Sequence, residues 1–362
     1  MSHESEDSPP HLAAGIAAPS AFAQSDPNQK STPAELVDAL NGVFGKQADN
    51  RAVHAKGIVL EGKFTPSAQA ATLSKAPHFQ GTAVPITVRF SDFAGVPTIP
   101  DTDANASPRG MAVKFHLPDG SDSDLVMHSY NGFPTATADE FRQLLIALAA
   151  SGPNAPKPTP LEKFFETHPI AKPFLTAEKP APVSYATMPY FGVNSFKFTN
   201  AKGDSTFVRY QMVPEGGAQY LTKEQLAAAG PNYLVDEIRK RVGGSPVRMK
   251  LQVQLAEAGD KIDDPSIAWP DSRKTVELGE IEIDKADPGS ARSRGFELLK
   301  RQDGQGGQPP QANLPVGSQR HHGCRVRRLA AVRRVFDDPG EVSDDELVIW
   351  REVVDYQRSE TA

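Results

Sequence analysis

Short segments that favour extended backbone recur along the chain, separated by clusters of proline, glycine and aspartate. Their residues are β-branched or alternate between apolar and polar, which predicts strands whose two faces meet different surroundings. They form two groups of four, at 52–63, 83–92, 109–117 and 122–130, and at 193–200, 204–213, 246–256 and 275–284. Eight such strands predict a closed antiparallel barrel, because closure leaves no strand edge unpaired.

Helical patterns precede and interrupt these strands. Thr32, Pro33 and Glu35 have the spacing of a helix start with a capping box, and Gly45 marks the end of that helix. Apolar residues at helical spacing return between 135 and 180 and over 222–242. The predicted fold class is therefore α+β, a closed eight-stranded antiparallel β-barrel with helical insertions.

Composition and charge exclude several classes of protein. The chain has 362 residues, of which 38% are hydrophobic, enough for a large core in one large domain or two ordinary ones. Its formal net charge of −6 argues against a nucleic-acid binder. No apolar run approaches the roughly 20 residues of a membrane span. The single Cys324 excludes an intrachain disulfide and a cysteine-based metal cluster.

Several segments that could carry chemistry follow one another in a fixed order. They are Arg51-Ala-Val-His54-Ala-Lys-Gly57, Val88-Arg-Phe-Ser91, Pro108-Arg-Gly-Met-Ala-Val-Lys-Phe115, Asp124-Leu-Val126, Trp269-Pro270 and Leu278-Gly-Glu-Ile281. A lone histidine such as His54 is by itself more often a core or surface residue than a catalyst. In this order, however, the segments resemble the haem catalases, most closely the smaller catalase-related peroxidase branch. The resemblance covers roughly residues 35–285 and implies the same eight-stranded barrel.

The resemblance also implies catalytic residues. His54 matches the distal histidine, which acts as base and then as acid when a peroxide is cleaved. Ser91 matches the serine whose hydroxyl binds the far nitrogen of that imidazole and fixes its tautomer. The asparagine that orients peroxide in larger catalases stands two residues after the Asp-Leu-Val segment, where this chain has His128. Asn131, three positions further on, is the candidate for that role.

The implied cofactor is heme b with its iron. Arg51 and Arg89 match the arginines that pair with haem propionates, a task that suits the forked, permanently charged guanidinium. Val53 and Phe133 are further candidate haem contacts, although the pattern around Phe133 favours packing in the core over a contact with the porphyrin. Arg109 is expected to serve the fold.

Beyond residue 285 the family pattern ends. Family members carry Arg-x-x-x-Tyr on a helix, with the tyrosine as axial iron ligand. Tyr356 lies five positions after Arg351 rather than four, and is the one candidate for this ligand. Residues 286–340 are irregular and rich in glycine, glutamine and proline, which indicates either a frame-shifted segment or a genuine, diverged tail; 341–362 predict a C-terminal helix.

The expected domains are thus a 31–285 haem-binding barrel and two flanking regions. Residues 1–30 form either a disordered tail or a leader-like segment, so that the bacterial cytoplasm and periplasm both stay open as locations. The expected function is a haem-dependent peroxidase that reduces hydrogen peroxide or organic hydroperoxides with a small organic donor, with weak catalase activity, in the response to oxidative stress. The alternatives are a haem-poor, non-enzymatic barrel and a lipid-hydroperoxide isomerase. A homo-oligomer is compatible with each of these three functions.

Overall fold

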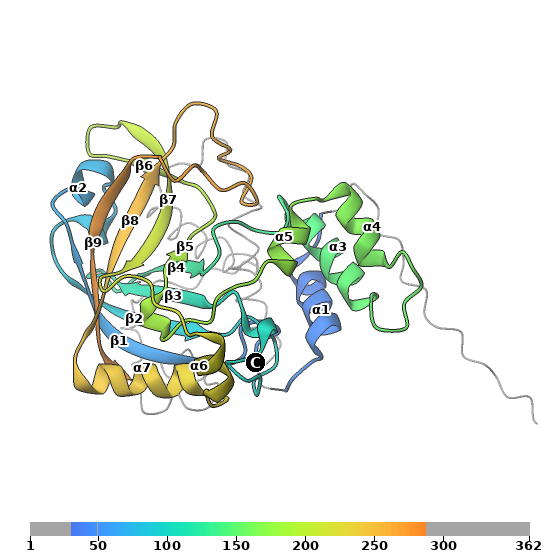
Figure 1. The fold of residues 1–362 in the computed structure, drawn as a ribbon. Helices are drawn as coiled ribbons and strands as arrows, with labels where there is room; N and C mark the ends of the chain where they lie inside the picture. The colour runs from blue at the N-terminus through green and yellow to red at the C-terminus, as the bar shows by residue number, and fades with distance from the viewer. Residues whose placement is uncertain (1–29, 49, 287–362) are drawn as a thin grey trace, which may run out of the picture. The chain divides into compact units, whose positions relative to one another are not determined.

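The computed structural model describes residues 30–48 and 50–286 (Figure 1). The predictions for 1–29, for the irregular segment after residue 286, for the C-terminal helix and for Tyr356 therefore lie outside the described residues. In the described part, the strands are β1 Gly57–Pro66, β2 Val84–Ser91, β3 Gly110–His116, β4 Asp122–His128, β5 Tyr190–Phe191, β6 Phe196–Thr199, β7 Ser205–Pro214, β8 Val247–Leu255 and β9 Thr275–Ala286.

Eight of these strands close into an antiparallel barrel, as predicted. The first four pair in chain order, β1 returns to β9, and β9, β8 and β7 pair in turn. The two-residue strand β5 closes the ring, because it pairs with β4 through His128↔Phe191 and with β7 through Tyr190↔Met212. Every strand of the ring therefore has a partner on both sides.

Two strand predictions need correction. The segment predicted at 193–200 is strand only over β6, which pairs with β7 along the same edge as β5; β5, which no strand prediction covered, lies just before it and supplies the link to β4. The segment predicted at 52–63 becomes strand only from Gly57 and runs on to Pro66. The residues before Gly57 form a turn that includes His54, whose φ of 55° lies in the left-handed region.

The helices follow their local signals. Helix α1, Pro33–Phe44, has the predicted capping box between Thr32 and Glu35 and ends at Gly45. The 135–180 region contains α3 Ala138–Ala149, α4 Pro160–Thr167 and α5 Ala171–Thr176. The helix predicted over 222–242 is two helices, α6 Lys223–Ala228 and α7 Tyr233–Gly244, because Gly230 and Pro231 interrupt it. Short helical turns complete the set: α2 Ala70–Leu73, η1 Pro77–Phe79, η2 Ala104–Ala106 and η3 Tyr185–Thr187.

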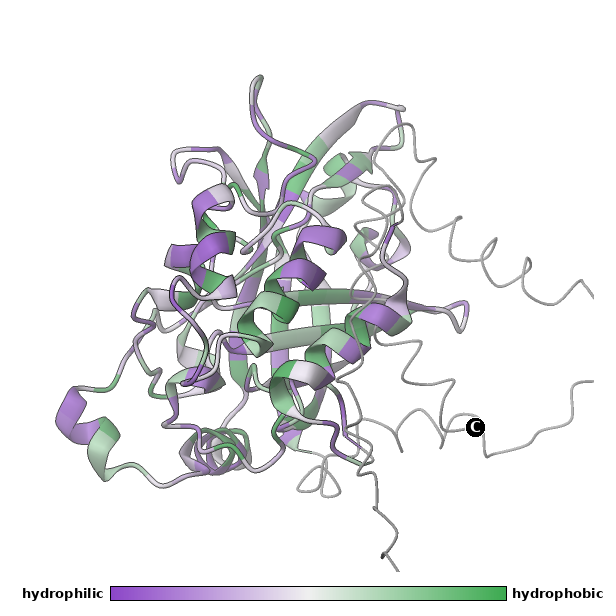
Figure 2. Ribbon diagram, turned by 90° about the vertical axis from the view of Figure 1, so that its right-hand side faces the viewer, coloured by the Kyte–Doolittle hydropathy of each residue, from purple (hydrophilic) through white to green (hydrophobic). Residues whose placement is uncertain are grey.

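Two large apolar clusters, and a small third one around Ala94 and Ile99, hold these elements together. The larger fills the barrel with alternate side chains of the strands, among them Ile58, Phe90, Met111, Met127 and Leu251. Each fully buried side chain of this kind contributes roughly 1.5–3 kcal/mol to folding. The second cluster joins α1, α3, α4 and α5 to the turn before β1. Figure 2 shows apolar stretches in green along the strands, while the helices carry both green and purple.

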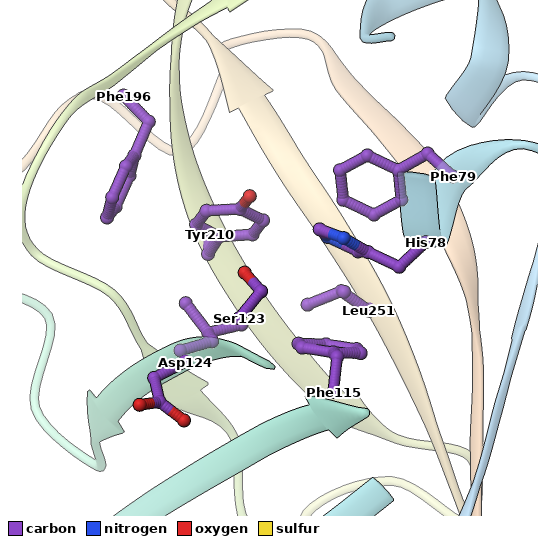
Figure 3. Close-up of a pocket in the computed structure, with 9 residues that line it drawn as sticks. His78, Phe79, Phe115, Ser123, Asp124, Phe196, Tyr210 and Leu251 are labelled. Atoms are coloured by element: carbon purple, nitrogen blue, oxygen red, sulfur yellow. The ribbon is translucent and has the colours of Figure 1, made fainter. Parts of the chain in front are cut away.

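A small cavity of about 10 Å³ lies within the barrel core (Figure 3). Its lining includes His78, Phe115, Ser123, Tyr210 and Leu251. This volume is close to the least that one water molecule needs, so the cavity is a packing feature rather than a substrate site. Among the helices that the structure describes, none has the length and apolar character to cross a membrane.

Candidate active site

Three residues of neighbouring strands form a row on the outer face of the barrel. Ser91 of β2 is the cross-strand partner of Gly110 of β3, and Gly110 is the partner of His128 of β4. Their chain neighbours Phe90, Met111 and Met127 belong to the barrel core. Because side chains alternate between the faces of a strand, Ser91 and His128 point away from that core. Both are nevertheless buried, so this part of the outer face is covered by protein.

The turn before β1 places His54 over this row. The His54 backbone N–H donates to the Phe93 carbonyl at 2.7 Å, and Arg89 Nη2 donates to the His54 carbonyl at 2.8 Å. The left-handed conformation costs a non-glycine residue roughly 1–2 kcal/mol. These two long-range hydrogen bonds hold the backbone of His54 in that conformation. Strain of this kind is typical of functional positions.

The imidazole of His54 occupies the space that a side chain at position 110 would need. Ser91 Oγ lies 3.1 Å from His54 Nδ1. A Cβ atom built on Gly110 would lie 2.8 Å from both Cε1 and Nδ1 of the imidazole and 2.7 Å from Ser91 Oγ. The ring also makes an edge contact with Phe93, at 5.5 Å between ring centroids. Gly110 is thus required for the approach of His54 to Ser91, a role that its place in the predicted Pro-Arg-Gly segment did not reveal.

Burial and neighbouring charge keep His54 neutral. Desolvation, followed by the charges of Arg89, His128 and Arg51, lowers the pKa of His54 to about 3, against a contribution in the other direction from a hydrogen bond with the Asp92 backbone. At neutral pH the imidazole is therefore unprotonated. His54 as a whole residue is only partly buried.

Arg89 binds the backbone of the turn that carries His54, and it also supplies positive charge beside the imidazole. Its Nη2 donates to the carbonyls of His54 and of Ala55, at 2.8 and 3.3 Å. Burial and the charge of Arg51 lower the pKa of Arg89 to about 9, so the guanidinium is still charged at neutral pH. Two half-buried cations therefore lie close together beside His54, an arrangement that favours an anionic ligand such as a carboxylate.

His128, rather than Asn131, is the polar residue that the structure brings beside His54. Its side chain is 9% exposed, and desolvation, together with the charge of Lys179, lowers its pKa to about 4. The backbone N–H of Tyr130 donates to His128 Nδ1 at 3.3 Å. Asn131 lies in the loop after β4 and is only half-buried. Its predicted role as the group that orients peroxide stays a prediction.

The two predicted apolar contacts lie in the helical cluster. Val53 and Phe133 are both buried there. The Phe133 ring lies 5.0 Å from that of Phe141, and 6.3 Å from the imidazole of His128, between centroids. Phe133 thus connects the helices with the row on the barrel, whereas Val53 fixes the turn that carries His54.

A buried polar network supports the site from behind. Arg109, next to Gly110, forms an ion pair with Asp92, next to Ser91, and the Tyr185 hydroxyl donates to the same carboxylate at 2.8 Å. Arg109 is 1% exposed, in keeping with the structural role expected for it. Asp92 and Tyr185 carry no local signal in the sequence, because their hydrogen bond joins segments 93 residues apart. In the part of the chain that the structure describes, no three histidine, cysteine or acidic side chains form a metal-binding cluster.

Several known proteins are similar to this chain in sequence. A model of the catalase family matches residues 33–286. The chain belongs to the catalase family. A catalase-related peroxidase of Mycolicibacterium paratuberculosis is 37% identical over 271 residues, which cover 74% of this chain and 84% of that protein. A catalase-related peroxidase of Synechococcus elongatus is 35% identical over 262 residues, covering 71% of this chain and 76% of that protein.

Solved structures of catalases share the fold. A fungal catalase superposes with a TM-score of 0.58 at 19% identity, covering 69% of this chain and 53% of the fungal chain. Catalase A from Saccharomyces cerevisiae gives the same TM-score at 20% identity, covering 70% of this chain and 55% of that chain. The catalase-family chain described here thus spans about half the length of these solved catalases.

Proposed function

We propose that this catalase-family chain is a haem-dependent peroxidase, an oxidoreductase that reduces hydrogen peroxide or an organic hydroperoxide with electrons from a small organic donor. Weak catalase activity is part of the proposal. The observation that carries it is the neutral imidazole of His54, held against Ser91 over Gly110. The two similar catalase-related peroxidases support the same reaction class.

The described residues fit one side of a haem group. His128 has a buried nitrogen without a hydrogen-bond partner among the described residues, and Arg51 and Arg89 supply the positive charge that propionates require. Heme b is the form we propose. When bound, its iron would hold the peroxide and accept the oxidising equivalents. The residue proposed to bind the iron, Tyr356, lies outside the described residues.

His54 would move one proton between the two peroxide oxygens. A pKa of about 3 leaves a ring nitrogen unprotonated at any pH where the chain works, so it can receive a proton from the first oxygen. The imidazolium that results is a strong acid for the same reason, and it returns the proton to the second oxygen, which leaves as water from hydrogen peroxide or as an alcohol from an organic hydroperoxide. Ser91 and the hydrogen bonds to the His54 backbone hold the ring in place during both transfers.

The proposal is tested by adding haem to the purified full chain and recording its absorption spectrum and its peroxide turnover with a phenolic donor. His54→Ala should bind haem with the spectrum of the wild type and should lose turnover by roughly 100-fold or more. His116→Ala, on β3 but outside the row, is the matched control and should keep the wild-type turnover. A spectrum of free haem in the wild type would contradict the proposal and favour the haem-poor barrel.

A further inference from the structure

His128 has a proton position that its surroundings determine. A backbone N–H can only donate, so the bond from Tyr130 requires Nδ1 of His128 to be the acceptor. The pKa of about 4 keeps the ring neutral, and a neutral imidazole carries a single N–H. The proton of His128 is therefore on Nε2. That atom is buried and has no hydrogen-bond partner among the described residues.

A buried donor without an acceptor is costly. Leaving such a group unpaired costs about 1–3 kcal/mol of stability. Here the ring is also enclosed by aromatic side chains, with the centroids of Phe133 and Phe174 each 6.3 Å from its own. An apolar residue would fill this space without the cost, so a donor at this position indicates an acceptor that the described residues do not provide.

The position of His128 indicates where that acceptor binds. His128 is the cross-strand partner of Gly110, the residue over which the His54 imidazole lies. Directly opposed residues of an antiparallel pair have their side chains about 4.5–5.5 Å apart on the same face. The charge of His128 also acts on the pKa of His54, as expected for neighbouring rings. Ser91 thus flanks the His54 imidazole on one side, and His128 flanks it on the other.

We propose that His128 is the substrate-orienting residue of this chain, and that its Nε2–H donates a hydrogen bond to an oxygen of the hydroperoxide held beside His54. This inference rests on the proposed function and assigns the two imidazoles different tasks. His54 transfers the proton, whereas His128 only donates a hydrogen bond, because its Nδ1 is committed to the Tyr130 backbone. The candidate Asn131 is not needed for this role.

The proton position can be measured without any cofactor. Long-range ¹H–¹⁵N correlation spectra of the ¹⁵N-histidine-labelled full chain at pH 7 distinguish the two neutral tautomers. His128, assigned by the peak that His128→Asn removes, should show the Nε2–H pattern. The Nδ1–H pattern or an imidazolium pattern at pH 7 would overturn the inference, whatever the state of the haem site.

The donor role can be measured with azide, a small anion that binds ferric haem. In the haem-loaded chain, His128→Phe should weaken azide binding by roughly tenfold through loss of one hydrogen bond. His128→Asn, whose amide keeps an N–H donor, should retain an affinity within about threefold of the wild type by the same reasoning. His116→Asn, outside the row, serves as the matched control and should leave the affinity unchanged.

Failure of this inference and failure of the proposed function are distinguishable. Equal azide affinity in His128→Phe and the wild type would overturn the role of His128 while leaving the peroxidase proposal intact. If azide binding depends on His128 but peroxide turnover is unaffected by His54→Ala, the role of His128 as hydrogen-bond donor stands and the peroxidase mechanism is rejected.

Discussion

His78 is expected to make the stability of this protein depend on pH. The residue lies on η1, 2% exposed, with its ring stacked on Phe115 at 4.7 Å and with Nδ1 lacking a hydrogen-bond partner among the described residues. It also lines the small cavity in the barrel core (Figure 3). Burial lowers its pKa from 6.5 to about 4, because the charged form would be desolvated in an apolar environment.

The size of the effect follows from proton linkage. Below pH 6.5 the unfolded chain binds a proton at His78, whereas the folded chain stays unprotonated down to about pH 4. The free energy of unfolding therefore falls by about 1.4 kcal/mol for each pH unit over this interval, on account of this residue alone. The total loss is about 3 kcal/mol. Above pH 6.5 neither state is protonated, and the effect vanishes.

The substitution His78→Leu removes the titrating group with little change in volume. Urea denaturation followed by circular dichroism is repeated between pH 7.5 and pH 4. The unfolding free energy of His78→Leu minus that of the wild type should increase by about 3 kcal/mol as the pH falls. Phe79→Leu, its neighbour in the same cluster, is the matched control and should lower stability equally at every pH. The reasoning is refuted if wild type and His78→Leu lose stability in parallel.

Two further predictions concern the site. In Gly110→Ala, the new Cβ would lie 2.7–2.8 Å from Ser91 Oγ and the His54 ring, so the imidazole must shift. We expect kcat/KM for peroxide to fall on the order of 100-fold, while Gly42→Ala, with open space in α1, leaves it unchanged. Unaltered turnover in Gly110→Ala would contradict this geometry. Because burial lowers the pKa of His54 to about 3, kcat/KM should show no inflection from His54 between pH 5 and pH 8. An inflection near pH 6.5 that disappears in His54→Gln would show that the imidazole titrates normally.

Much of the fold was predictable because its signals are local. The capping box at Thr32 and Glu35 marked α1 to the residue, and alternation marked most strands of the barrel. The turn at His54 was not predictable, since its neighbours have ordinary strand propensities. Its conformation depends on hydrogen bonds from Arg89 and to Phe93, which only the folded chain brings together.

The same distinction applies to the site. The segments that carry His54 and Ser91 were recognisable, and the structure brings these two side chains together. The importance of Gly110 and His128 depends on the register between β3 and β4, which no local pattern encodes. Likewise, β5 has only two residues, too few for alternation to be visible, yet it joins β4 to β7.

The short strand β5 makes the barrel closure and the site mechanically interdependent. Only one residue pair, His128↔Phe191, connects β4 to β5, so this is the shortest pairing of the ring. Local opening events in proteins begin where few contacts must break. Opening at this point would free the β5-facing edge of His128 and leave its end of β4 held by the pairing with Gly110 of β3. Amide hydrogens near residues 128 and 191 should therefore exchange with solvent earlier than those of β1 or β8, and a ligand that binds to His128 would slow their exchange by keeping the barrel closed.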